Sequence, residues 1–197
     1  MESNKISIRY MKESDTLGVF NVHCELFPMD YSMRYIRSFL EKDMIPLLLI
    51  EENGSEEVII GVAIFRMSWV SFFSTQRNAY LCTFGIIPSR QRHGFATDLL
   101  RISCILLKYH YGITYLTLHM EILNDAAFRF YTKFGFTVKE IIKGYYKYKN
   151  KIGDANFMHI DIPFDKNYDL INKVFIDKSI EDNISNPVSI SWLGSFF

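Results

Sequence analysis

Two periodicities of apolar residues alternate along the chain, one typical of strands and one of helices. Segments in which apolar residues alternate with polar ones, or form short apolar runs, are expected to be β-strands. They lie at residues 6–10, 47–51, 58–67, 78–87, 115–120, 136–149 and 156–161. Segments whose apolar residues recur every three or four positions are expected to be helices. They lie at residues 16–26, 32–40, 94–111 and 124–133.

This order of elements predicts an α/β fold. Helices interleaved with strands are expected to cover both faces of a central sheet whose strands run in mixed directions. The chain contains neither an internal repeat nor a low-complexity tract. We expect one domain over residues 1–162 and a C-terminal extension over residues 163–197, with a weak helical stripe and an apolar end. The stripe consists of Leu170, Ile171, Val174 and Phe175.

Composition narrows the class of protein. The 197 residues suit a single domain, and the equal numbers of basic and acidic residues, 22 each, lack the positive charge that nucleic-acid binding requires. The three cysteines are scattered, which argues against a disulfide framework or a zinc site. No signal peptide is visible, and the apolar runs are far shorter than the ~20 residues of a membrane-spanning helix. We therefore expect a cytoplasmic protein with no metal and no nucleic-acid partner.

The segment between the strand at 78–87 and the helix at 94–111 is suited to bind phosphate. Gly94 and Ala96 are small enough to let the backbone approach a ligand closely. Arg92 and the unpaired N–H groups at the start of the helix would attract a pyrophosphate. The alternative is an ordinary helix N-terminus with a glycine in its turn.

Two motifs resemble the GNAT acetyltransferase superfamily. Gln91-x-x-Gly94-x-Ala96 is similar to the loop that binds the pyrophosphate of acetyl-CoA in that family, and the surrounding elements follow the family's order. Further along, the segment from Asn124 to Tyr131 resembles the signature whose asparagine and tyrosine hold the CoA arm. The resemblance implies a GNAT fold with about seven strands in its sheet, and acetyl-CoA as co-substrate without a metal. The implied cofactor contacts are Phe84, Gly85, Ile86, Gln91, Arg92, His93, Gly94, Phe95, Ala96, Thr97, Asn124 and Tyr131.

Four further matches resemble N-alpha-acetyltransferases of the NatE and NatF types, and the whole resemblance spans residues 6–162. They are the loop Phe27-Pro28-Met29-Asp30-Tyr31, Tyr80 in a central strand, His119 in the next strand, and Tyr145-Tyr146 on a late hairpin. By this resemblance Tyr80 and His119 are a catalytic pair, and Tyr131 is the proton donor to the leaving thiolate. The implied substrate-binding residues are Phe27, Pro28, Met29, Tyr31, Cys82, Tyr145 and Tyr146.

The chemistry of an α-amine fits these residue types. An amine attacks a thioester only when it is neutral, and a peptide α-amine has a pKa of ~7.7–8.0 against ~10.4 for lysine. A modest base acting through one water therefore suffices, and His119 has a suitable ordinary pKa. Tyr80 would orient the water, or act as a second base if its pKa were lowered. Alternation places Tyr80, Cys82, Phe84 and Ile86 on one face of their strand.

The family resemblance implies acetylation of protein N-termini that retain methionine before a hydrophobic residue. The apolar loop at Phe27–Tyr31 would bury the first side chain of the substrate, which is worth ~1.5–3 kcal/mol for a large aliphatic residue. Met29 is bulkier than this loop is expected to carry. Rival functions are acetylation of lysine side chains or small amines, and a non-catalytic subunit that binds CoA or a peptide. In the structural alternative, His119 and Tyr131 are core residues; the other four histidines are taken as structural.

The C-terminal extension bears on the choice between the two enzyme types. The long hairpin up to Ile162 and the Arg92-His93-Gly94 run are more similar to the NatF type, whose members lie on the cytosolic face of Golgi or plasma membranes. An apolar end with Trp192 and Phe197 would suit the headgroup boundary, although no Lys or Arg follows Lys178. The tail could instead pack on the domain or a partner. A NatE-type enzyme would be soluble and could dock as a subunit of a larger acetyltransferase complex.

Overall fold

The computed structural model describes residues 5–69, 77–148, 151–162, 175–176 and 189–191. These residues form two compact units. Unit 1 comprises the described residues within Met1–Ile64, Thr83–Ile105 and Phe164–Phe197, and unit 2 comprises those within Phe65–Cys82 and Leu106–Pro163.

The described residues form strands and helices in the predicted order. The strands are β1 (Lys5–Tyr10), β2 (Met44–Asn53), β3 (Glu56–Trp69), β4 (Arg77–Ile86), β5 (Ile113–Glu121), β6 (Thr137–Tyr148), β7 (Lys151–Asp161), β8 (Phe175–Ile176) and β9 (Ser189–Ser191). The α-helices are α1 (Thr16–Leu26), α2 (Met33–Arg37), α3 (Phe95–Tyr111) and α4 (Asp125–Phe134). Short 3₁₀ helices are η1 (Glu13–Asp15), η2 (Ser38–Leu40) and η3 (Pro88–Arg90).

Strand pairing confirms the mixed sheet. The hydrogen-bonded order is β6-β7-β5-β4-β3-β2-β1-β9-β8. β4 and β5 pair in parallel, whereas β1 with β2, β5 with β7, and β6 with β7 pair antiparallel. The predicted strands correspond to β1 through β7, and β8 and β9 come from the C-terminal extension.

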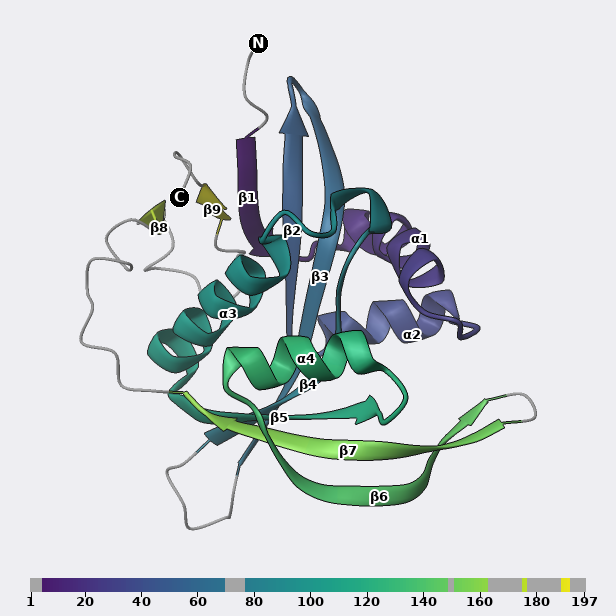
Figure 1. Cartoon of the computed structure of the whole chain (residues 1–197). Helices are drawn as coiled ribbons and strands as arrows, with labels where there is room; N and C mark the ends of the chain where they lie inside the picture. The colour runs from purple at the N-terminus through teal and green to yellow at the C-terminus, as the bar shows by residue number, and fades with distance from the viewer. Residues whose placement is uncertain (1–4, 70–76, 149–150, 163–174, 177–188, 192–197) are drawn as a thin grey trace. The chain divides into compact units, whose positions relative to one another are not determined.

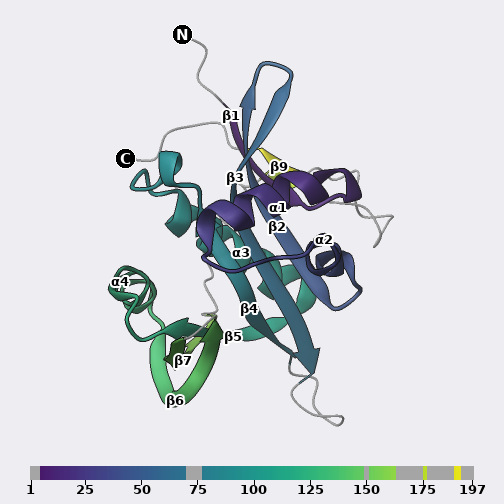
Figure 2. The same ribbon diagram turned by 90° about the vertical axis from the view of Figure 1, so that its right-hand side faces the viewer.

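In unit 1, helices cover both faces of the strands, as predicted. α1 and α2 lie on one face and α3 on the other (Figures 1 and 2). β2 lies between β1 and β3, and Leu47, Leu48, Leu49 and Ile50 are all buried. A strand covered on both faces needs a continuous apolar run rather than alternation, which explains this part of the sequence.

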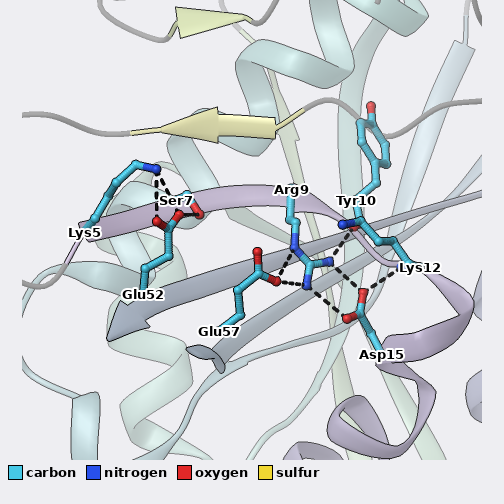
Figure 3. Close-up of polar contacts among 8 residues, drawn as sticks. All are labelled: Lys5, Ser7, Arg9, Tyr10, Lys12, Asp15, Glu52 and Glu57. Carbon is cyan, nitrogen blue, oxygen red and sulfur yellow. Dashed lines mark hydrogen bonds and ion pairs between the residues drawn. The ribbon is translucent and has the colours of Figure 1, made fainter. Parts of the chain in front are cut away.

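The first strand is fixed in unit 1 by a buried cation (Figure 3). The Arg9 guanidinium donates hydrogen bonds to the Asp15 carboxylate at 2.6 and 3.0 Å and to Glu57 Oε2 at 2.6 and 3.1 Å. Burial by itself would raise the pKa of Asp15, but hydrogen bonds from Arg9 and from the Lys12 N–H outweigh it and lower that pKa. Such pairing is what allows a charged group to be buried at this position.

In unit 2, the first part of β4 pairs with β5, followed by β7 and β6. The two ends of the helix α4 are set by residues that are typical of helix ends. Asn124 Oδ1 accepts a hydrogen bond from the Ala127 N–H at 3.0 Å, which caps the first turn. Gly135 has φ +118° and ends the helix, a conformation that glycine adopts without strain.

Burial differs along the face of β4 on which the sequence places Tyr80, Cys82, Phe84 and Ile86. Tyr80, Cys82 and Phe84 are half-buried on the same side of β4, but Ile86 is buried rather than sharing their exposure. The reason is Gly61, where an added Cβ would lie 2.5 Å from Ile86 Cδ1, so the missing side chain makes room for Ile86.

The helical stripe predicted in the extension is wrong at Phe175, the one stripe residue that the structure describes. Phe175 lies in β8, and the segment Ser189–Ser191 pairs antiparallel with β1. Extended strands here satisfy backbone groups that β1 would otherwise present as an open edge. The other stripe residues and the apolar end after Ser191 lie outside the described residues.

Candidate active site

Three aromatic side chains in unit 2 are joined by hydrogen bonds and ring stacking. Tyr80 comes from β4, His119 from β5 and Tyr145 from β6. The Tyr80 hydroxyl oxygen lies 3.1 Å from His119 Nδ1 and 3.3 Å from the hydroxyl oxygen of Tyr145. The rings of His119 and Tyr145 stack with centroids 4.2 Å apart and 10° between their planes. The structure thus brings together the pair that the sequence predicts and adds Tyr145 to it.

Because the hydrogen bond to Tyr80 uses Nδ1 of His119, the other ring nitrogen, Nε2, is available to accept a proton. Within the part of the chain that the structure describes, no group is hydrogen-bonded to His119 Nε2. In one proton arrangement Nδ1–H donates to Tyr80 and the Tyr80 hydroxyl donates to Tyr145, so that Nε2 carries a free lone pair. A neutral imidazole held in this tautomer can accept a proton at Nε2.

Burial sets the protonation of this cluster. Burial lowers the pKa of His119, and the negative charge of Glu140 offsets part of that effect, so the imidazole is neutral at pH 7. Burial also raises the pKa of Tyr80, and its hydrogen bond with Tyr145 raises it further. The condition for Tyr80 to act as a second base, a lowered pKa, is therefore not met. Tyr80 remains a neutral hydroxyl that orients its partners.

Tyr131, the predicted proton donor, lies on α4. Its ring is buried against Phe130 and Phe136, with centroids 5.2 and 5.4 Å away. Burial raises the pKa of Tyr131 and a nearby Tyr146 adds to the effect, so the hydroxyl keeps its proton at neutral pH. A protonated hydroxyl is the form that can donate to a leaving group.

The predicted phosphate loop belongs to unit 1 and turns between β4 and α3. Arg92 has φ +67° and Gly94 has φ +86°, and the first value is uncommon for a residue with a side chain. Left-handed residues in a turn gather N–H groups into a concave anion site, to which the start of α3 adds its own unpaired N–H groups. Gln91 Nε2 donates to the Ile86 carbonyl at 2.9 Å and fixes the loop to the end of β4. The residues present therefore fit a phosphate group.

The predicted substrate loop, also in unit 1, is anchored on a buried histidine. His23 contacts the rings of Phe27 and Tyr31, with centroids 5.5 and 5.2 Å away. Burial raises the pKa of Tyr31 to about 12, so it stays protonated. Pro28 and Met29, by contrast, are exposed. The two aromatic residues thus hold the loop, while Pro28 and Met29 between them present apolar atoms.

The remaining predicted residues lie beside these groups. Cys82 is half-buried on β4, and Tyr146 meets the ring of Tyr145 edge-on at 5.0 Å. Gly85 faces Leu26 so closely that an added Cβ would lie 2.8 Å from its Cδ1. His93 Nδ1 lies 2.7 Å from the Gln91 carbonyl, which gives that histidine a role in the shape of the loop.

A comparison with protein families identifies the fold. Residues 16–136 match the model of the acetyltransferase (GNAT) family. The chain belongs to this family. The family predicted from the sequence is thereby confirmed, and acetyl-CoA is the co-substrate that it supports.

Individual GNAT relatives are similar at low identity. N-alpha-acetyltransferase 50 of Danio rerio is 27% identical over 122 residues, which are 62% of this chain and 68% of that protein. The crystal structure of Arabidopsis thaliana NAA60 with a bisubstrate analogue aligns with a TM-score of 0.69 and 20% identity, over 80% of this chain and 99% of that one. The ribosomal-protein-S18-alanine N-acetyltransferase of Escherichia coli gives a TM-score of 0.67 and 20% identity, over 82% and 97%.

Sequence reasoning missed how this GNAT chain holds Tyr145 against His119. The signal in the sequence that could have predicted this position is Gly144, because a glycine inside a strand pattern often marks a bulge. It also missed Phe157, whose ring lies 5.0 Å from that of His119.

Of the helices described, none is both long enough and apolar enough to cross a bilayer.

Proposed function

We propose that the protein is an N-alpha-acetyltransferase that acetylates the α-amine of protein N-termini, with a preference for methionine followed by a hydrophobic residue. The observation that carries the proposal is the cluster of Tyr80, His119 and Tyr145, in which a neutral histidine keeps one nitrogen without a partner among the described residues. The proteins to which the chain is similar include N-alpha-acetyltransferases, which supports the same substrate class.

Each residue of the cluster has a distinct role in the proposed reaction. Acetyl-CoA supplies an acetyl group activated as a thioester. His119 accepts the proton of the attacking amine at Nε2 through a water, and Tyr80 holds the imidazole in the tautomer that this requires. Tyr131 keeps a proton that it can give to the leaving sulfur. Tyr145 and Tyr146 offer hydroxyl groups to the backbone of the peptide.

The protonation state of the histidine favours an α-amine over a lysine side chain. At neutral pH roughly a tenth of α-amines are neutral, against under about one in a thousand lysines. A histidine whose pKa is lowered by burial is a weak base, and it suits an amine that loses its proton easily. The apolar atoms of Pro28 and Met29 fit a hydrophobic first side chain better than a polycation.

A peptide panel tests the substrate class. Peptides that begin with Met-Leu, Met-Lys, Ser-Glu or Ala-Glu, each with one internal lysine, are incubated with acetyl-CoA, and the acetylated position is read by mass spectrometry. We expect acetylation of the α-amine, fastest for Met-Leu, and none on matched peptides with a blocked α-amine. Acetylation of the internal lysine or of spermidine at a higher rate would favour the rival acetyltransferase functions. Acetyl-CoA binding without turnover of any acceptor would favour a binding subunit.

We further propose a NatF-type enzyme in the cytoplasm whose apolar end contacts a membrane surface. The support is the long β6–β7 hairpin and the aromatic residues after Ser191, with the NatE type as the second choice. Cosedimentation of the full chain with phosphatidylcholine vesicles, compared with the Trp192→Ser variant, tests the contact. Equal recovery of the two proteins in the supernatant would contradict the membrane contact. It would instead favour a tail that packs on protein, and the NatE type.

A further inference from the structure

The β6–β7 hairpin is irregular just before Tyr145. Ile142 pairs with Ala155 and Tyr146 pairs with Gly153, so four steps along β6 correspond to two steps along β7. Two extra residues in β6 therefore bulge opposite Asp154. Bulges bend a strand, increase its twist and redirect the side chains next to them. The strong curvature of β6 is visible in Figure 1.

The bulge is held by one carboxylate. Asp154 Oδ1 accepts a hydrogen bond from the Gly144 N–H at 2.9 Å, and Oδ2 accepts one from Lys143 Nζ at 2.7 Å. Gly144 has φ +63°, which a residue with a side chain adopts only with strain. The backbone carbonyl of Asp154 also accepts from the Ile122 N–H at 3.1 Å. Asp154 therefore joins the bulge to the segment that follows β5, the strand of His119.

Tyr145 needs this bend to reach the histidine. The strand order places β7 between β5 and β6, so Tyr145 must cross β7 to stack on a residue of β5. In the ladder, the residue across from His119 on β7 is Phe157, and the residue across from Phe157 on β6 is Glu140 rather than Tyr145. A regular strand would carry Tyr145 away from His119 along the hairpin.

We propose that Asp154 is a positioning residue, which fixes the Lys143–Gly144 bulge and thereby holds Tyr145 over His119 and Tyr80. The inference rests on the proposed function for its effect on the peptide, because Tyr145 is one of the residues assigned to the peptide backbone. Its effect on His119 is independent of turnover. Loss of the carboxylate frees the bulge, moves Tyr145 from the imidazole and exposes His119 to water.

The first measurement follows the imidazole directly. The protein is labelled with ¹³C-histidine, the His119 signal is assigned by its loss in H119A, and its titration is compared in wild type, D154A, D154N and K143A. Groups facing His119 are Tyr80 on β4, and Tyr145 and Glu140 on β6. Because burial lowers the pKa of His119, we expect D154A to shift its titration upward toward ~6.5.

The matched variants separate the carboxylate from its charge. D154N keeps an oxygen that accepts from the Gly144 N–H, so its His119 titration is expected to stay close to wild type. K143A removes only an exposed ion pair, which contributes little, and is expected to titrate like wild type. If D154A does not fold, G144A replaces it: the positive φ strains any side chain there, and the same upward shift is expected.

The second measurement is steady-state kinetics with a Met-Leu peptide. We expect D154A or G144A to raise the peptide KM by about tenfold or more, with the acetyl-CoA KM within about twofold of wild type. An unchanged His119 titration in D154A or G144A would overturn the proposal, as would an unchanged peptide KM alongside a shifted titration. If the wild type acetylates no peptide, the proposed function fails and the titration alone decides whether Asp154 positions Tyr145.

Discussion

Two histidines of this chain are each surrounded by aromatic rings and each hydrogen-bonded to a hydroxyl of β4, yet they differ in what their second nitrogen does. His23 in unit 1 is fully buried; its Nδ1 lies 2.8 Å from the Val19 carbonyl and its Nε2 lies 3.1 Å from Thr83 Oγ1. His119 in unit 2 uses Nδ1 for Tyr80 and is half-buried.

The difference follows from which ring nitrogen carries the proton and what the other nitrogen accepts. A carbonyl only accepts, so His23 Nδ1 carries the proton and Nε2 accepts from the Thr83 hydroxyl. Both nitrogens are then occupied, and burial lowers the pKa of His23 so that it stays neutral. Aromatic surroundings and a hydroxyl partner therefore do not distinguish a catalytic histidine from a structural one. The feature that we propose as distinguishing is a nitrogen to which no group in the described part of the chain is hydrogen-bonded.

The largest expected effect on turnover comes from removing the open nitrogen. We expect His119→Ala to lower kcat by ~10²-fold or more, because it deletes the proposed general base, while binding of acetyl-CoA persists. The measurement is steady-state acetylation of the Met-Leu peptide together with a calorimetric titration of acetyl-CoA. His110→Ala, an exposed histidine on α3, is the matched control and should behave like wild type. A kcat within about threefold of wild type in His119→Ala would remove the base from the mechanism.

Removing the hydroxyl that holds His119 is expected to have the next largest effect. Tyr80→Phe keeps the ring but deletes the hydrogen bond to Nδ1, so the imidazole loses its fixed tautomer. We expect kcat to fall at least about tenfold. In the double variant with His119→Ala, the loss should be far smaller than the product of the single losses, because both residues act through one imidazole. Full activity of that double variant would refute the assignment of both.

The pH dependence of turnover reports on His119, whereas the pH dependence of stability reports on both buried histidines. Because burial lowers the pKa of His119, the acidic limb of kcat should fall below ~6.5, the value of a free histidine. Both His23 and His119 are kept neutral by burial, so the unfolded chain binds more protons below pH ~6.5 and stability declines as the pH falls from there. Turnover and thermal unfolding measured over the same pH range report the two effects. A kcat limb above the free-histidine value would contradict the buried, neutral state of His119.

The sequence predicted the elements well, and it predicted which candidate residues meet only where their meeting follows from the strand pattern. Tyr80 lies on β4 and His119 on β5. Both strands alternate apolar and polar residues and they pair directly in the sheet, so the meeting of the two side chains follows from the topology. Tyr145 is different, because its position depends on a two-residue register shift that Asp154 stabilises. A side chain hydrogen-bonding the backbone of the facing strand leaves no periodic signal. Only the glycine in the strand, Gly144, indicated that a register shift occurs there.

Ile86 and the buried ion cluster of Arg9 were beyond prediction for a related reason. The exposure of Ile86 depends on the absence of a side chain at Gly61, which lies on another strand. Arg9 reads as the polar position of an alternating strand, yet it is buried because Asp15 and Glu57 both reach it. Each case depends on a residue far away in the sequence, Gly61 for Ile86 and Glu57 for Arg9, and local periodicity carries no information about it.

The smallest effect on turnover is expected at the hydroxyl partner of the structural histidine. Thr83→Val keeps the branched shape of the side chain but leaves Nε2 of buried His23 without its donor. An unsatisfied buried acceptor costs ~1–3 kcal/mol, so the free energy of unfolding should fall by about that amount in urea titrations. Thr83→Ser retains the hydroxyl and should recover much of the loss. Because neither nitrogen of His23 exchanges protons with substrate, kcat below the unfolding temperature should stay within about threefold of wild type. A collapse of kcat in Thr83→Val with stability unchanged would mean that His23, despite its two occupied nitrogens, takes part in the reaction.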